Sequence, residues 1–131
     1  GTVSGLREGL VDFEVLVRID EHLELVAVVT RVSAEQLGLA IGSEVIALVK
    51  ASSLLLIVDE TMRISARNRL WGEVQRIVEG PVNAEVTLDL GRGRSAVAVV
   101  TRDSVESLGL AVGVRACAAF KVSSVILAMI D

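Results

Sequence analysis

An internal repeat constrains the fold of this chain more than any other feature of its sequence. Residues 1–60 align without a gap on residues 72–131, an offset of 71, and 25 of the 60 aligned pairs are identical. The longest identical block joins residues 26–31 to residues 97–102. Self-similarity of this kind indicates copies of one structural module. We therefore predict two modules, residues 1–60 and residues 61–131.

Composition excludes several classes of protein. Apolar residues make up 52% of the 131 residues, too many for a disordered chain. No 18-residue stretch is free of charge, so no membrane span is expected. One Cys and one His disfavour a disulfide framework and a zinc site. A net charge of −4 and a content of only three aromatic residues disfavour nucleic-acid binding. No signal peptide is recognisable, which predicts a cytoplasmic protein.

Each copy reads as a small β-module. Apolar and polar residues alternate over residues 11–19, which predicts a strand, and residues 23–30 follow as a second strand. Ser33 is expected to cap a short helix that ends at Gly38. Two more strands are predicted at residues 44–49 and 53–58. The fold class expected is all-β, with two tandem OB-like five-stranded barrels that each carry a short helical turn.

The two copies differ in what precedes them. Residues 62–71 lead into the second copy and carry the start of a strand, whereas the first copy begins at Gly1 without such a lead-in. We expect the first module to lack its N-terminal strand. A missing upstream segment is favoured over a strand borrowed from elsewhere.

A set of hydrogen-bond donors recurs in both copies, and none of them is a carboxylate. The residues 62–71 segment adds three more donors. Hydroxyls, amides and cationic side chains suit an anion that presents acceptors in every direction. The recurring set is Thr30, Ser33, Lys50 and Ser52 with Thr101, Ser104, Lys121 and Ser123, and the added donors are Ser65, Arg67 and Asn68.

Each of these residues also has an ordinary structural explanation. Serine before a helix is a common cap, lysine at a strand end is a common edge residue, and threonine favours strands. The donors alone therefore indicate an anion without identifying it. His22 is expected in a surface turn and Cys117 in an apolar strand, so no catalytic triad can be assembled and no enzyme is expected.

The ordered set of motifs resembles the molybdenum-pterin-binding, or molbindin (Mop), family. The set comprises Ile-Ser-Ala-Arg-Asn at 64–68, Glu-Gly-Pro-Val-Asn at 79–83, Val-Val-Thr at 99–101, Leu-Gly-Leu at 108–110 and Lys-x-Ser at 121–123. Its tandem form is similar to the two-module storage proteins and to the molybdate-binding domain of the molybdate-responsive transcription regulator. The resemblance covers nearly the whole chain, twice.

That resemblance implies binding and storage of molybdate or tungstate, for molybdenum homeostasis, at subunit interfaces of a homo-oligomer. A trimer is favoured over a dimer, and neither membrane nor direct nucleic-acid binding is expected. The recurring and added donors would supply the oxyanion site. A second kind of site would involve Gly80, Val82 and Asn83, but the first copy has Asp12 in place of Asn83, and a carboxylate repels an anion.

Two other functions remain open at this point. One is the ligand-sensing domain of a molybdate-dependent transcription regulator, which an upstream helix-turn-helix would favour. The other is a nucleic-acid-binding OB module, which salt-sensitive binding to oligonucleotides would favour.

Overall fold

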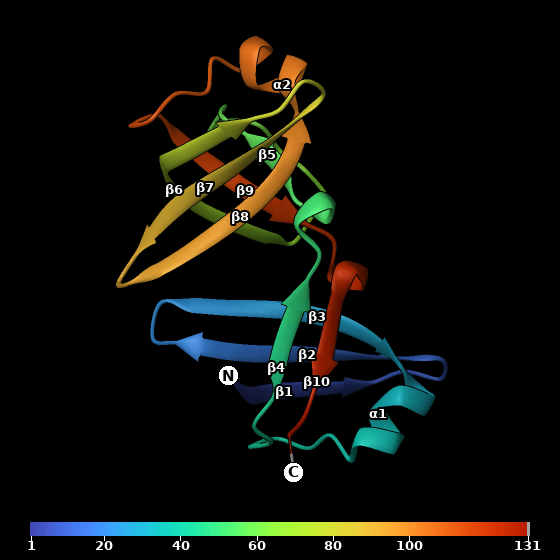
Figure 1. The fold of residues 1–131 in the computed structure, drawn as a ribbon. Coiled ribbons are helices and arrows are strands. Elements are labelled where there is room, and N and C mark those ends of the chain that lie inside the picture. The colour runs from blue at the N-terminus through green and yellow to red at the C-terminus, as the bar shows by residue number, and fades with distance from the viewer. Residues whose placement is uncertain (131) are drawn as a thin grey trace. The chain divides into compact units, whose positions relative to one another are not determined.

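The computed structural model describes residues 1–130, which form ten strands and two short α-helices (Figure 1). Two single-turn 3₁₀ helices, η1 and η2, complete the secondary structure. In chain order the elements are β1 Thr2–Glu8, β2 Asp12–Asp20, β3 Leu23–Thr30, α1 Arg31–Leu37, β4 Ile46–Val49, η1 Ala51–Ser53, β5 Leu55–Ile57, β6 Asn68–Glu79, β7 Asn83–Gly91, β8 Arg94–Thr101, α2 Arg102–Ser107, β9 Arg115–Phe120, η2 Val122–Ser124 and β10 Val125–Ala128.

The chain divides into two compact units whose limits differ from those of the sequence repeats. The continuous unit is Lys50–Phe120. The discontinuous unit consists of Gly1–Val49 together with the segment that begins at Lys121. The first sequence repeat ends near residue 60. The chain passes from the discontinuous to the continuous unit ten residues earlier, at Lys50, and returns at Lys121.

The continuous unit is built on one antiparallel sheet with the strand order β5-β9-β6-β7-β8. Its outer strands, β5 and β8, contact each other. Ala84, Val86 and Leu88 of β7 are buried and alternate with exposed or half-buried residues, so this face of the strand lies in the core. All five residues from Ala116 to Phe120 on β9 are buried, which places β9 in the core of this unit.

The discontinuous unit contains a three-stranded sheet, β1-β2-β3, and a two-stranded sheet, β10-β4. The alternation predicted for residues 11–19 is present in β2, where Val15 and Val17 have no exposed surface. Val3 and Ala27 join them in the core of the unit.

The two repeats exchange their last strands. Strand β5, from the first repeat, pairs with β9 of the second, and β10, from the second repeat, pairs with β4 of the first. Figure 1 shows the green β4 beside the red β10. The chain crosses from one unit to the other through two equivalent segments, residues 50–53 and 121–124, which contain η1 and η2. Each unit therefore contains residues of both repeats.

The expected fold class, all-β with two OB-like modules, is confirmed, with two differences in detail. Both α-helices begin earlier than expected. Thr30 and Thr101 are the N-caps, and each Oγ1 accepts a hydrogen bond from a backbone N–H three residues on, at 3.1 Å in both cases. Ser33, predicted as the cap, lies inside the first turn of α1. Gly38 ends α1 as expected, with φ of 64°.

The second difference concerns the N-terminal strand. The sequence predicts no such strand in the first module, whereas in the structure β1 pairs with β2 from Thr2 to Glu8. By the repeat, β1 corresponds to the part of β6 that follows Gly72. The earlier part of β6, from Asn68 to Gly72, pairs with β9.

Within residues 1–130, no helix is long and apolar enough to cross a membrane. The same residues contain no group of three or more His, Cys, Asp or Glu side chains placed to hold a metal ion. Cys117 is buried in β9, as its apolar neighbours predicted, and burial raises the pKa of its thiol.

Candidate functional site

The continuous unit has a shallow pocket where the two repeats meet. Its volume is about 260 Å³, and three of the predicted donors line it: Ser52 from the first repeat, with Thr101 and Ser104 from the second. The rest of the wall is apolar and consists of leucines and valines of β5 and β8 with Leu54 and Leu108, which follow η1 and α2. The exchange of strands therefore brings together donors that lie about fifty residues apart in the sequence.

Two of the three hydroxyl groups in this pocket are ordered by hydrogen bonds. Thr101 Oγ1 accepts the Ser104 N–H, and the Thr101 and Ser104 hydroxyl oxygens lie 2.7 Å apart. Each hydroxyl has one hydrogen to donate, and one of the two hydrogens is used within the pair. The other remains for an external acceptor, so the pair offers a donor whose direction is set by the helix cap.

The discontinuous unit repeats this arrangement. Thr30 Oγ1 accepts the Ser33 N–H and donates to Ser33 Oγ at 2.9 Å, which leaves the Ser33 hydrogen to donate. Ser123 lies in η2, and η2 contacts β3, the strand that ends at Thr30. The equivalent lysines, Lys50 and Lys121, immediately precede η1 and η2. Both lysines are exposed and can add a positive charge at these positions.

The two donor groups differ in their neighbouring charges. The helix of the continuous unit has Asp103 in its first turn, directly before Ser104, whereas α1 has the uncharged Val32 at that place. Next to each helix cap is an arginine with a carboxylate neighbour. Arg102 Nε lies 3.8 Å from Glu79 Oε2, and Arg31 Nε lies 2.9 Å from Glu35 Oε1.

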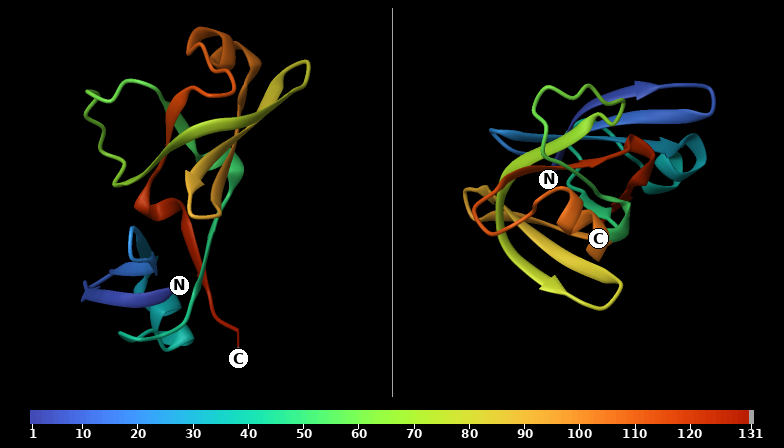
Figure 2. Two further views of the ribbon diagram at one scale, coloured as in Figure 1. Left: turned by 90° about the vertical axis from the view of Figure 1, so that its left-hand side faces the viewer. Right: turned by 90° about the horizontal axis from the view of Figure 1, so that it is seen from above.

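Ser65 and Arg67 lie in the loop between β5 and β6, seen as a wide arc in the left view of Figure 2, and Asn68 begins β6 directly after it. Exposure alternates along the end of this loop. Ser65 and Arg67 are exposed, while Ala66 and Asn68 are buried. Ala66 packs against Ile57 and the β9 core, and Ile64 packs against the same cluster. The loop therefore turns Ser65 and Arg67 toward solvent together.

A tight turn orders the start of this loop. One carboxylate oxygen of Asp59 accepts hydrogen bonds from the Thr61 N–H at 2.9 Å and from the Thr61 hydroxyl at 2.7 Å. These bonds favour the charged carboxylate and hold the pKa of Asp59 below its ordinary value.

Asn68 has a different environment from the other predicted donors. Only 2% of its surface is exposed, and it begins β6 opposite Phe120. No buried side-chain nitrogen or oxygen in the described part of the chain lacks a hydrogen-bond partner. This position suits a residue that anchors the loop to β6 better than one that reaches a ligand in solvent.

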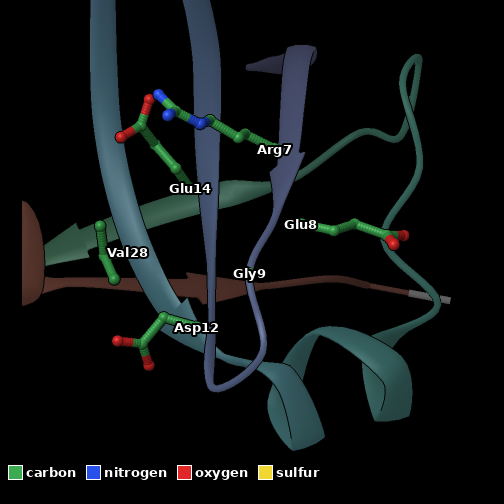
Figure 3. Close-up of a pocket in the computed structure, with 6 residues that line it drawn as sticks. All are labelled: Arg7, Glu8, Gly9, Asp12, Glu14 and Val28. Atoms are coloured by element: carbon green, nitrogen blue, oxygen red, sulfur yellow. The ribbon is translucent and has the colours of Figure 1, made fainter.

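The place of the predicted second kind of site is acidic in the discontinuous unit. A cavity of about 210 Å³ there is lined by Arg7, Glu8, Gly9, Asp12, Glu14 and Val28. Figure 3 shows the ends of Arg7 and Glu14 pointing toward one another, while the side chains of Asp12 and Glu8 point in other directions. Three carboxylates and one guanidinium disfavour an anion, as Asp12 indicated from the sequence.

The equivalent residues of the continuous unit form a hairpin. The Gly80 N–H donates to the Asn83 carbonyl at 2.8 Å, and the Val82 carbonyl accepts from the Arg102 N–H at 2.9 Å. The Gly80 N–H, a main-chain donor that could bind an anion, is thus used within the protein. Val82 and Asn83 are exposed.

One polar cluster beside the candidate loop was not predicted from the sequence. Arg115 of β9 contacts both Glu60 and Trp71. The repeat could not indicate this arginine, because Glu44 occupies its position in the first copy.

Comparison with known proteins identifies the class to which this fold and these donors belong. The sequence profile of the TOBE domain matches the chain twice, at residues 1–56 and 64–127. The chain therefore belongs to the TOBE-domain family, within its Mop-type molybdate-binding members, and the resemblance noted in the sequence is confirmed. This family comprises binding proteins and regulator domains rather than a known class of enzymes.

Three individual proteins show which members of this family the chain resembles. A crystal structure of the cytoplasmic molybdate-binding protein ModG with molybdate bound superposes with a TM-score of 0.95 and 48% identity, covering 99% of this chain and 93% of that chain. The molybdenum transport protein ModE of Azotobacter vinelandii is 60% identical over 98% of this chain and 48% of its own length. MopA of Rhodobacter capsulatus, a molybdenum-pterin-binding protein, is 49% identical over 98% of this chain and 49% of its own length. The chain spans about half the length of these two relatives.

Proposed function

We propose that this chain binds molybdate and tungstate as part of a cytoplasmic, non-enzymatic system of molybdenum homeostasis. The observation that carries the proposal is the pocket that unites Ser52 with Thr101 and Ser104. The likeness to ModG, solved with molybdate bound, supports the ligand and the location. Tungstate is included because both ions are tetrahedral dianions with the same arrangement of acceptor oxygens.

The chemistry of the donors fits such a dianion. Hydroxyl groups held by helix caps offer hydrogen bonds in fixed directions, and Lys50 and Arg67 would add charge-assisted ones. A fully deprotonated oxyanion accepts from all of these groups and needs to donate to none. Hydroxyl donors of this kind leave the ion chemically unchanged, which suits storage rather than catalysis.

The shallow shape of the pocket fits a site shared between subunits. A small dianion in an open pocket keeps part of its hydration, so a second surface with donors would complete its coordination. Ser65 and Arg67 are exposed and suit that role for another copy of the chain. Ligand binding would then stabilise the oligomer, for which a trimer is our first expectation and a dimer the second.

Binding is tested by thermal unfolding in the presence of single anions. We expect molybdate and tungstate to raise the unfolding temperature, because a ligand at 100 times its Kd stabilises the folded state by about 2.7 kcal/mol. Equal concentrations of sulfate and phosphate serve as controls for ionic strength and charge. An equal shift with all four anions would contradict a selective oxyanion site, and no shift with any of them would remove the proposed function.

The donor assignment is tested by removing hydroxyls that cap nothing. Ser104→Ala keeps the Thr101 cap intact, because Thr101 Oγ1 bonds to the backbone N–H of residue 104. Ser104→Ala and Ser52→Ala are each expected to weaken molybdate binding about tenfold or more, since a hydrogen bond to a charged group is worth about 1.5–3 kcal/mol. Ser95→Ala, on an exposed position of β8, is the matched control in the same calorimetric titration. Unchanged affinity in both site variants would place the ligand elsewhere.

A second function is kept as the alternative. One ModE relative, from Yersinia pestis, is a transcriptional regulator that is 34% identical over 83% of this chain and 41% of its own length, so this sequence also fits the ligand-sensing part of a molybdate-dependent transcription regulator. The two functions share the same oxyanion site. Molybdate-dependent binding of the complete gene product to promoter DNA would establish the regulator, and its absence would leave storage.

A further inference from the structure

Arg115 makes two contacts at once on the surface of the continuous unit. Its Nε donates to Glu60 Oε1, and its guanidinium carbon lies 5.0 Å from the centre of the Trp71 ring. A planar guanidinium can pair with a carboxylate through its edge while its face stacks on an aromatic ring. The three residues come from β9, from the start of the loop and from β6, so the cluster joins three separate segments.

This cluster encloses the loop that carries the candidate donors. Glu60 lies just after the start of the loop, and Trp71 lies four residues beyond Arg67. Inside the loop, Ala66 is buried at 6% exposure against the core, and Trp71 packs against the same apolar cluster. The loop is therefore held at its start by an ion pair and at its end by apolar packing, with Ser65 exposed between the two.

We propose that Glu60, Arg115 and Trp71 are positioning residues that order the loop of Ser65 and Arg67 before the oxyanion arrives. The inference rests on the proposed function of that loop. A loop that is already ordered loses less conformational entropy when it binds, so its affinity for the ligand is higher.

The discontinuous unit lacks the arginine of this cluster. At the position of Arg115 it has Glu44, whose carboxylate accepts a hydrogen bond from the Thr2 hydroxyl at 2.9 Å. The opposite charge at this position rules out the same pairing. The cluster of Glu60, Arg115 and Trp71 therefore belongs to the continuous unit. The two repeats differ at Arg115, which does not line the pocket.

The cluster is expected to affect binding more than folding. The side chains of Arg115 and Glu60 are 60% and 59% exposed, and an exposed ion pair contributes little to stability. Without the cluster, the side chains of the loop must be ordered when the ligand binds. That ordering corresponds to about a three- to tenfold loss of affinity.

The experiment compares Arg115→Gln, Glu60→Gln and the double variant in the full chain. Affinity is measured by titration with molybdate, loop order by the rate at which trypsin cleaves after Arg63 without ligand, and the surroundings of the cluster by emission of Trp71, the single tryptophan. Arg92→Gln is the control, since it removes one positive charge at an exposed turn between β7 and β8.

We expect each single variant to bind three- to tenfold more weakly, to be cleaved faster in the loop and to shift the Trp71 emission. The double variant should be no weaker than Arg115→Gln, because both changes break one interaction. Arg115→Lys should recover part of the affinity, since it keeps the charge and loses the planar group. Arg92→Gln should leave cleavage and emission unchanged.

Two results would overturn the inference. One is wild-type affinity in Arg115→Gln and Glu60→Gln, and the other is a loss of affinity matched by Arg92→Gln, which would indicate only a change in total charge. If the unaltered protein binds neither molybdate nor tungstate, the proposed function fails separately. Cleavage and Trp71 emission would then still show whether the cluster orders the loop.

Discussion

Residues 50–120, made as a separate polypeptide, are expected to fold as a monomer with a cooperative thermal transition, whereas residues 61–131 are not. The first fragment contains all five strands of the β5-β9-β6-β7-β8 sheet. The second fragment follows the sequence repeat and loses β5. It also carries β10, whose partner β4 lies in the absent part of the chain.

The expected difference is large because the exchanged strands carry core residues. Leu54 and Ile57 are 6% and 8% exposed in the intact chain, and Val125 and Leu127 are 3% and 7% exposed. Burying each of these side chains is worth about 1.5–3 kcal/mol. Losing the contributions of Leu54 and Ile57 removes about 3–6 kcal/mol, a large part of the whole stability of a small domain, about 5–15 kcal/mol. Val125 and Leu127 lose their packing partner β4 and stay exposed, which favours association of the fragment.

The comparison is well matched, since both fragments are 71 residues long and share residues 61–120. Circular dichroism on heating and size-exclusion chromatography at several concentrations give the result. We expect residues 61–131 to be unfolded, or to associate by exchanging β10 between copies. If the fragment of residues 61–131 were monomeric and melted as cooperatively as residues 50–120, the compact unit would not be the part of the chain that folds independently.

Gly72→Ala is expected to destabilise the protein by about 1–3 kcal/mol, the usual cost of forcing an extra methyl group into a packed site. A Cβ on residue 72 would lie 2.4 Å from the backbone carbonyl oxygen of Asp89. That oxygen belongs to β7, directly across from β6, and cannot move without disturbing the ladder between the two strands. No neighbouring side chain can therefore move to relieve the strain.

Gly5→Ala is the control for this substitution. Gly5 also lies in a strand, β1, but its Cβ would meet the Cδ1 atom of Leu16 at 2.8 Å. The end of a leucine side chain can rotate away, so Gly5→Ala should cost clearly less. Urea unfolding of both variants measures the difference, and equal losses would show that the backbone contact at Gly72 is not the cause.

The strands of this fold could be predicted from the sequence, but the exchange of strands could not. The alternation around Val15 and Val17 requires a buried face and predicts β2 within one residue. The segments that contain η1 and η2 share Lys-x-Ser-Ser, and the strands after them are equally apolar. Either strand would therefore fit either unit, and the choice depends on the path of the chain at residues 50–53 and 121–124.

Within the candidate site, the sequence predicts the donors that recur in both copies. Thr101 and Ser104 are predicted in this way and line one pocket, although Thr101 and not Ser104 is the helix cap, because threonine and serine cap helices about equally well. Asn68 was identified from its motif, and its burial depends on tertiary packing that a motif does not contain. Arg115 was missed because a repeat indicates only what its copies share.

The exchanged strands also make the paired modules insensitive to dilution. Two separate polypeptides that exchanged strands in this manner would dissociate as their concentration fell. Here the two repeats are joined in one chain, and a short covalent tether gives its ends an effective concentration of about millimolar order. The partner of each strand is thus always present, and the pairing of β4 with β10 persists however little of the protein a cell contains.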